Sequence, residues 1–198
     1  MIIIGITGSI GSGKTTVAKL FSRHWYNRID ADEIGHEIIK KNSIAYKKII
    51  NNFGNEILDK NKNIDRKKLG DIVFNDNNKV RKLNSITHPI ISNEIKKRIK
   101  EIKEKCGSKT KIIVDAPLLL ETRKKKLVDK IVVVKCSKKN ILKRLSKKYP
   151  EEKLERILNL QMPLDKKLKY ADFVIDNNKD LRHLEKQVKD IIKIMENK

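Results

Sequence analysis

The chain has 198 residues, with 47 Lys or Arg against 25 Asp or Glu, which gives a formal net charge of +22 at pH 7. A hydrophobic fraction of 38% is low, but it is enough for the core of one ordinary domain and argues against disorder throughout. No apolar run approaches the roughly 18 residues of a membrane span. Met1 leads directly into Ile2 without a basic leader, so we expect a soluble protein that is not secreted.

The two cysteines, Cys106 and Cys136, lie far apart and outside any metal-ligand pattern, so they predict reduced thiols in a cytoplasmic protein. The positive charge is compatible with a nucleic-acid surface, an anionic small substrate or biased residue usage. Lysines are scattered along segments of helical period, and only 5% of residues are aromatic, so solvated helix faces are favoured over a nucleic-acid site. We expect no nucleic-acid partner, no membrane partner and a monomer.

The first half of the chain begins with a strand and then becomes mainly helical. The apolar run at 1–7 predicts a buried strand, and the segment after Lys14 predicts a helix. A short second strand is expected at 27–30. The following region has no comparable apolar run, and its expected helix starts are Asp65, Asp76 and Thr87, the last with Pro89 in its first turn.

Strands return in the second half, where runs rich in Ile and Val occupy 111–116, 129–136 and 171–177. Between the last two strands, Tyr149 and Pro150 separate two helix-like segments, which predicts a helix, a break and a second helix that could form a hinged lid. The segment from Asp180 to Lys198 should form a helix that packs on the sheet. This alternation predicts an α/β fold with five parallel strands.

The strongest motif directly follows the first strand. Residues 8–15 read GSIGSGKT, which satisfies the phosphate-loop pattern G-x-x-x-x-G-K-[ST] between a strand and a helix. Loop N–H groups and the helix N-terminus favour phosphate oxygens, Lys14 should reach the β- and γ-phosphates, and the Thr15 hydroxyl should bind Mg²⁺. The expected nucleotide-binding residues are Gly8, Gly11, Ser12, Gly13, Lys14, Thr15 and Thr16.

Acidic residues end two of the expected strands. Asp30 and Asp32 close the second strand, at the sheet edge that carries the phosphate loop. Asp32 could accept the proton of an attacking hydroxyl or cap the next helix, and both roles can coexist. Asp115 ends the third strand, where it could hold Mg²⁺ and border the substrate, or begin a turn before Pro117.

Several basic residues outside the loop are candidates for binding anions. Arg144 precedes the expected lid and could neutralise charge on a transferred phosphoryl group, whereas the neighbouring Lys147 and Lys148 are more typical of a solvated helix face. Arg66, Arg81 and His88 lie in the helical region and could bind an anionic substrate.

Seven segments in order along the chain resemble the dephospho-CoA kinase family. They read GITGSIGSGKTT at 5–16, IDAD at 29–32, FGNEIL at 53–58, DRKKLGDIVF at 65–74, ITHPII at 86–91, VDAPLLLE at 114–121 and LQMPLDKKLKYADFVIDN at 160–177. The phosphate loop is common to many kinases, but the combination with DAD, HP and D-x-PLL-E is much more specific.

The resemblance implies a P-loop three-layer α/β/α fold, with a nucleotide-binding core at 1–32 and 106–198, a helical substrate-binding insertion at 33–105 and a lid at about 145–163. It also implies transfer of the ATP γ-phosphate to the 3′-hydroxyl of dephospho-CoA with Mg²⁺, the last step of coenzyme A biosynthesis. By analogy, Asp32 is the base or hydroxyl-orienting residue, Arg81 and His88–Pro89 lie beside the substrate, and Lys14 and Arg144 serve catalysis.

Two positions depart from the family pattern. Lys147–Lys148 stand where a second lid arginine is usual, and lysine keeps the charge but lacks the planar fork. Leu120 stands where an aromatic residue is frequent, which predicts a change in packing. Two other functions stay open, namely another P-loop nucleoside or nucleotide kinase, and a basic P-loop ATPase stimulated by DNA or RNA.

Overall fold

The computed structural model describes residues 1–73, 75–107, 109–121 and 126–196. They divide into two compact units, of which the first comprises 1–30 and 98–198 and the second comprises 31–97. Phe74 of the expected helix after Asp65, and residues 197–198 of the expected C-terminal helix, lie outside the described residues. No helix in the described ranges has the length and apolar character that a membrane crossing requires.

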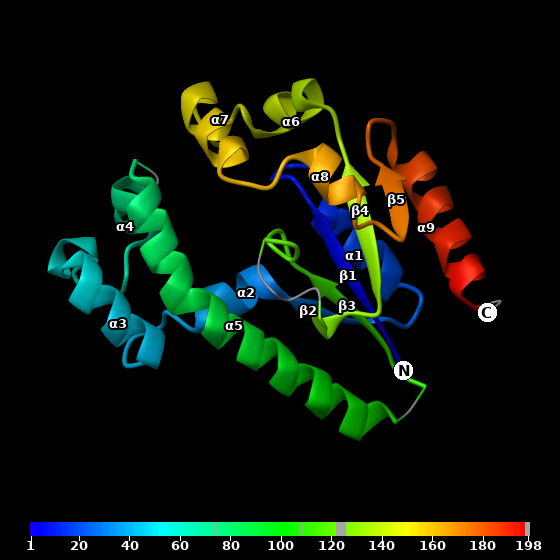
Figure 1. Ribbon diagram of the computed structural model, residues 1–198, viewed down its shortest axis with the longest axis horizontal. Helices are drawn as coiled ribbons and strands as arrows, with labels where there is room; N and C mark the ends of the chain where they lie inside the picture. Colours follow the sequence, from blue (N-terminus) through cyan, green and yellow to red (C-terminus); the bar gives the residue numbers. More distant parts are fainter. Residues whose placement is uncertain (74, 108, 122–125, 197–198) are drawn as a thin grey trace. The chain divides into compact units, whose positions relative to one another are not determined.

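The first unit is built on five parallel strands, as the apolar runs predict. They are β1 (Ile2–Gly8), β2 (Asn27–Asp30), β3 (Lys111–Asp115), β4 (Lys130–Lys135) and β5 (Phe173–Asp176), in the spatial order β2-β3-β1-β4-β5 (Figure 1). The strand order places β1, which carries the glycine-rich loop, at the centre of the sheet. Buried Ile and Val side chains fill the three central strands β3, β1 and β4, because both faces of a parallel sheet are covered there. The edge strands β2 and β5 each bury one isoleucine, Ile29 and Ile175.

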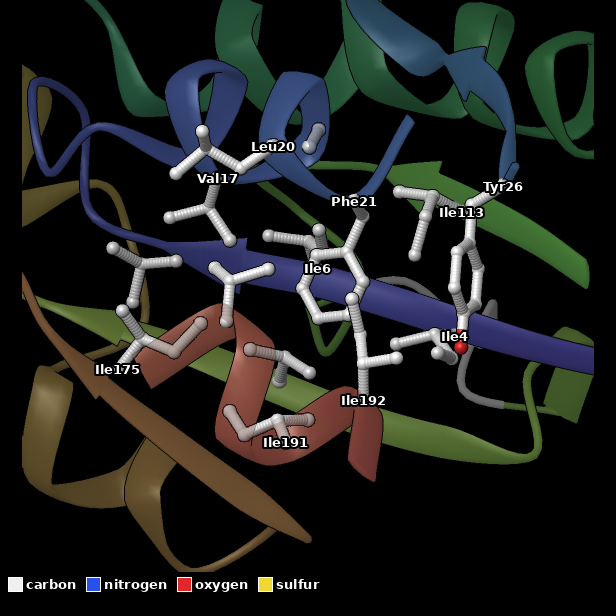
Figure 2. Packing of buried hydrophobic residues seen from close by; sticks show 14 of the residues in the cluster. Ile4, Ile6, Val17, Leu20, Phe21, Tyr26, Ile113, Ile175, Ile191 and Ile192 are labelled. Atoms are coloured by element: carbon white, nitrogen blue, oxygen red, sulfur yellow. The ribbon is translucent and has the colours of Figure 1, made fainter. Parts of the chain in front are cut away.

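Helices α1 (Lys14–Ser22) and α9 (Leu181–Glu196) cover one face of the sheet. Ile4 and Ile6 of β1 contribute to the core beneath them, together with Phe21 and Tyr26, whose rings meet edge to face at 5.4 Å between centroids (Figure 2). The expected packing of the C-terminal helix on the sheet is confirmed, since its apolar stripe is buried in this core, namely Leu184, Val188, Ile191 and Ile192.

The opposite face of the sheet receives the alternate residues of β1, because successive strand side chains point to opposite sides. Thr7 donates from its hydroxyl to the Pro117 carbonyl oxygen at 3.0 Å on this side, and Lys167 of α8 (Leu164–Leu168) donates to the same oxygen at 3.0 Å. Helix α8 also packs against β4. The three-layer α/β/α architecture expected from the resemblance is therefore confirmed.

The helix, break and second helix predicted around Pro150 are α6 (Lys138–Leu145) and α7 (Glu151–Asn159), with Pro150 at the N-cap of α7. A side chain caps α6, since Ser137 accepts a hydrogen bond from the Asn140 N–H at 3.3 Å. Sequence patterns did not predict α8 as a separate helix, because five residues are too few to show a period.

The second unit consists of short helices around their own apolar cluster. It contains α2 (Ala31–Glu37), α3 (Ile44–Phe53), the 3₁₀ turn η1 (Asn55–Ile57), α4 (Arg66–Val73) and the first part of α5 (Asn77–Cys106). Asp65 and Asp76 precede helices as predicted. Asp65 Oδ1 accepts from the Lys67 N–H at 2.8 Å, and Asp76 Oδ1 accepts from the Asn78 N–H at 2.7 Å.

The helix start expected at Thr87 is wrong, because Thr87 and Pro89 lie inside the 30-residue helix α5. The Thr87 hydroxyl donates to the Leu83 carbonyl oxygen at 3.0 Å, one turn earlier, as a threonine does in a helix interior. Pro89 supplies no N–H for the Ser85 carbonyl, but Ser85 is exposed, so water can satisfy that oxygen. The helix therefore continues through the proline.

Candidate active site

The glycine-rich loop joins the end of β1 to the start of α1. Its backbone requires glycine at two positions in particular. Gly8 has φ of +154°, and a Cβ there would lie 2.4 Å from the Val134 carbonyl oxygen. Gly13 has φ of +93°, and a Cβ there would lie 2.1 Å from Asn177 Nδ2. The close backbone packing at Gly8 and the left-handed conformation at Gly13 therefore exclude a side chain at these two positions of the turn.

The residues of the phosphate-loop pattern occupy their expected places in this turn. Lys14 is the first residue of α1, is 8% exposed, and donates from Nζ to the Ser9 carbonyl oxygen at 3.0 Å. Thr15 and Thr16 follow it and are exposed. Ser12 is buried, and its Oγ has no hydrogen-bond partner in the described part of the chain. The loop therefore brings together all seven residues that the motif predicted for nucleotide binding.

Arg144 reaches the loop from α6 and ties it to the end of β5. Its Nη1 donates to the Gly11 carbonyl oxygen at 3.3 Å and lies 3.4 Å from Cys136 Sγ, while its Nη2 donates to the Asn177 carbonyl oxygen at 2.9 Å. Asn177 in turn donates from Nδ2 to the Ser12 carbonyl oxygen at 2.7 Å. Burial raises the pKa of the Cys136 thiol, so this cysteine stays neutral beside the guanidinium.

A cavity of about 260 Å³ lies beside this arrangement, within the first unit. It combines a guanidinium with leucine side chains and loop glycines, a lining that suits a flat ring next to bound phosphates. Its lining residues are Gly11, Gly13, Thr16, Arg144, Asn177, Lys179, Leu181 and Leu184. Sequence reasoning missed Asn177, although its place directly after β5, at the carboxyl edge of the sheet, was a usable signal.

Two carboxylates meet at the ends of β2 and β3. Asp30 and Asp115 are paired in the strand register, and both accept hydrogen bonds from Arg28 Nη2, at 2.8 Å in the case of Asp115 Oδ2. Arg28 was missed as a site residue. The period of two in a strand places it on the same face as Asp30, so the spacing could have identified it.

Burial raises the pKa of Asp115, which is 3% exposed, and the hydrogen bond and charge of Arg28 oppose that rise, as does the charge of Lys14. The Asp115 Oδ1 atom has no hydrogen-bond partner in the described ranges. No group of three or more His, Cys, Asp or Glu side chains that could hold a metal occurs there either. One carboxylate oxygen and the Thr15 hydroxyl nevertheless fit Mg²⁺, which takes few protein ligands and completes its shell with phosphates and water.

The remaining predicted site residues belong to the second unit. Asp32 is the second residue of α2, so it lies in the first turn of that helix and not before it, as the capping interpretation expected. Its side chain is exposed. Arg66 is the first residue of α4 and is exposed. Arg81 and the half-buried His88 are seven residues apart on α5 and therefore share one helix face, with the exposed Pro89 next in the chain.

A phosphate loop at the centre of a five-stranded parallel sheet, with carboxylates at the adjoining strand ends, defines an ATP-dependent phosphotransferase of the P-loop class. The fold is shared with shikimate kinase from Acinetobacter baumannii, at 16% identity, a TM-score of 0.56 and coverage of 100% of this chain and 95% of the other.

Comparison with known proteins narrows that class. The family model for dephospho-CoA kinase matches residues 2–183. The dephospho-CoA kinase of Aquifex aeolicus is 42% identical over 95% of this chain and 94% of its own, and that of Fusobacterium nucleatum is 44% identical over 95% of each. A solved dephospho-CoA kinase from Campylobacter jejuni is 30% identical, with a TM-score of 0.70 and coverage of 98% of this chain and 96% of its own. The chain belongs to the dephospho-CoA kinase family.

Proposed function

We propose that this enzyme transfers the γ-phosphoryl group of ATP to the 3′-hydroxyl of dephospho-CoA, giving CoA and ADP. The observation that carries the proposal is the family match over residues 2–183, which spans the phosphate loop, the paired carboxylates and the helical second unit. The reaction is the last step of coenzyme A biosynthesis. We also propose that the enzyme is a cytoplasmic monomer without a nucleic-acid or membrane partner.

The donor nucleotide would occupy the glycine-rich loop and the cavity beside it. Loop N–H groups and the N-terminus of α1 bind the phosphates, and Lys14 neutralises the charge that develops between the β- and γ-phosphates. The adenine ring would lie in the cavity between Arg144 and Leu181. Arg144 is fixed to the loop carbonyls, so its charge is already in place when the phosphoryl group leaves the donor.

Thr15 and Asp115 would hold Mg²⁺, Thr15 through its hydroxyl and Asp115 through Oδ1 directly or by way of a water molecule. When bound, the ion neutralises charge on the β- and γ-phosphate oxygens. Arg28 leaves Oδ1 of Asp115 available, because its hydrogen bond goes to Oδ2. Asp115 would thereby also border the reacting groups of the substrate.

Asp32 would accept the proton of the attacking 3′-hydroxyl as the new P–O bond forms and the bond to the ADP oxygen breaks. Arg66, Arg81 and His88 would bind the anionic acceptor, with Pro89 shaping the helix face next to His88. Arginine suits this task because its planar fork matches phosphate oxygens. The helical insertion at 33–105, which contains most of the second unit, would bind the substrate. The segment at about 145–163, which contains α7, would form the lid.

The proposal is tested by an ADP-release assay with dephospho-CoA, run beside AMP, TMP and adenosine as acceptors. We expect selective turnover of dephospho-CoA and near-complete loss of it in Lys14→Met, which keeps side-chain length but removes the charge. Selective turnover of another acceptor would overturn the acceptor assignment. ATP turnover that depends on DNA or RNA, and on no small acceptor, would overturn the small-molecule kinase assignment.

A further inference from the structure

Two side chains hold one peptide group of the phosphate loop from opposite ends. Gln161, in the connection between α7 and α8, accepts a hydrogen bond from the Ile10 N–H through its Oε1 at 3.0 Å. Lys14 Nζ donates to the Ser9 carbonyl oxygen at 3.0 Å. This carbonyl and this N–H belong to the same planar peptide group, so fixing the orientation of one fixes the other.

The chemistry of the contact fixes which way the Gln161 amide faces. A backbone N–H can only donate, so its partner must be the amide oxygen, and the Nε2 group must lie on the other side. Nε2 has no hydrogen-bond partner in the described part of the chain. The observed bond from Gln161 to the loop is therefore made through its acceptor alone.

A buried ionic anchor holds Gln161 against the loop. The N–H of the next residue, Met162, donates to Glu121 Oε1 at 3.0 Å. The same oxygen pairs with Lys167 Nζ at 2.7 Å, and the Lys167 side chain is completely buried. Lys167 also donates to the Pro117 carbonyl oxygen at 3.0 Å. A buried pair with these additional hydrogen bonds resists displacement, since separating it would leave a charge without compensation.

The anchor joins the same strand that carries the phosphate loop. Thr7, the next-to-last residue of β1, donates to the Pro117 carbonyl oxygen that Lys167 also contacts. The loop is thus connected to the α7–α8 connection at Ile10 and, through the anchor, at the end of β1. The contact of the neighbouring Met162 with Glu121, which pairs with Lys167, therefore holds Gln161 in place to orient the Ser9–Ile10 peptide.

We propose that Gln161 is a positioning residue for phosphoryl transfer, which orients the Ser9–Ile10 peptide so that its carbonyl directs the Lys14 ammonium toward the phosphates of the donor. This inference rests on the proposed function. Gln161 acts through Lys14 and not by contact with the nucleotide. Its loss leaves the charge of Lys14 and the other loop N–H groups in place, so alignment for transfer suffers more than donor binding.

Gln161→Met tests the inference because it keeps the length of the side chain and removes the acceptor, whereas Gln161→Glu keeps the acceptor. We expect Gln161→Met to lower kcat about tenfold to a hundredfold, with the KM for ATP within about threefold of wild type. Gln161→Glu should keep kcat within about fivefold, although its negative charge near the phosphates should raise the KM for ATP. Lys166→Met, an exposed position on α8, should match wild type.

A second readout is independent of turnover. In ¹H–¹⁵N spectra of the free enzyme, we expect the Ile10 amide proton to move upfield in Gln161→Met, as a lost hydrogen bond requires, and to stay near its place in Gln161→Glu. An unchanged Ile10 resonance in Gln161→Met would overturn the inference, as would a kcat within twofold of wild type. A wild-type enzyme that fails to phosphorylate dephospho-CoA would overturn the proposed function, while the spectra would still decide the role of Gln161.

Discussion

Arg28 donates from Nη2 to Asp115 Oδ2 at 2.8 Å, and so joins β2 and β3 at the sheet edge where the phosphate loop begins. The Asp115 side chain is 4% exposed and that of Arg28 is 21% exposed, so the pair is shielded from water. Arg28 also contacts Asp30. One guanidinium therefore keeps two neighbouring carboxylates together and reduces their mutual repulsion.

Replacing Arg28 should raise the pKa of Asp115. Burial already raises this pKa, and the hydrogen bond and charge of Arg28 lower it. Because Arg28→Met removes both lowering effects, the pKa of Asp115 rises further. The variant should therefore lose Mg²⁺-dependent activity at a higher pH than wild type as the solution is acidified. A carboxyl ¹³C titration of Asp115 measures the pKa directly.

Arg23→Met is a suitable control for this titration, because the Arg23–Glu185 ion pair is solvent-exposed and joins the C-cap of α1 to α9, away from Asp115 in the sheet. It should leave the pKa of Asp115 unchanged. An Asp115 titration in Arg28→Met that coincides with wild type, or falls below it, would show that Arg28 does not stabilise the ionised carboxylate.

Replacing Arg144 by lysine should weaken nucleotide binding. Its guanidinium donates to carbonyl oxygens of Gly11 and Asn177 at the same time, and an ammonium cannot span both. We expect Arg144→Lys to weaken ATP binding about tenfold, as measured by calorimetry. Lys143→Met, on the same helix and exposed, removes a charge without touching the loop, so it should bind ATP as wild type does. Equal losses of ATP affinity in both variants would show that the hydrogen bonds of Arg144 to the loop do not contribute to ATP binding.

The core beneath α1 should be sensitive to truncation at Phe21. This ring is fully buried between the sheet and α9 and packs edge to face on Tyr26 (Figure 2). Phe21→Ala should lower the free energy of unfolding by about 3–5 kcal/mol, and Trp25→Ala should change it by less than about 0.5 kcal/mol. Trp25 is 90% exposed and serves as the matched aromatic control. Urea unfolding curves for both variants give the comparison.

The sequence predicted most of the sheet well because β1, β3, β4 and β5 are short apolar runs, whereas β2 contains one apolar residue, Ile29. The phosphate loop was predictable for a different reason, since the turn requires its glycines and phosphate binding requires a lysine at position 14. Helix boundaries within α5 were not predictable. Thr87 and Pro89 have the local chemistry of a helix start, but Ser85 is exposed, so water can satisfy the carbonyl that Pro89 leaves without a donor and the helix continues.

The contacts that complete the site depend on residues far apart in the chain, so no local pattern indicated them. Gln161 meets Ile10 across 151 positions, and Asn177 meets Ser12 across 165. Arg28 differs, because its spacing from Asp30 within one strand was visible in the sequence. The partner on β3, Asp115, becomes apparent only once the strand order is known.

Asp32 offers a direct test of acceptor activation. Its side chain is exposed in the first turn of α2, where a negative charge also favours the helix N-terminus. Asp32→Asn preserves shape but removes the proton acceptor, so we expect kcat for dephospho-CoA to fall about a hundredfold or more, with ATP affinity unchanged. Glu33→Gln removes a charge from the same helix turn and should keep kcat within about threefold, since a first-turn charge contributes only modestly to helix stability. Parallel losses of kcat in the two variants, or a loss of ATP affinity in Asp32→Asn, would show that Asp32 stabilises the N-terminus of α2 and does not accept the proton of the attacking hydroxyl.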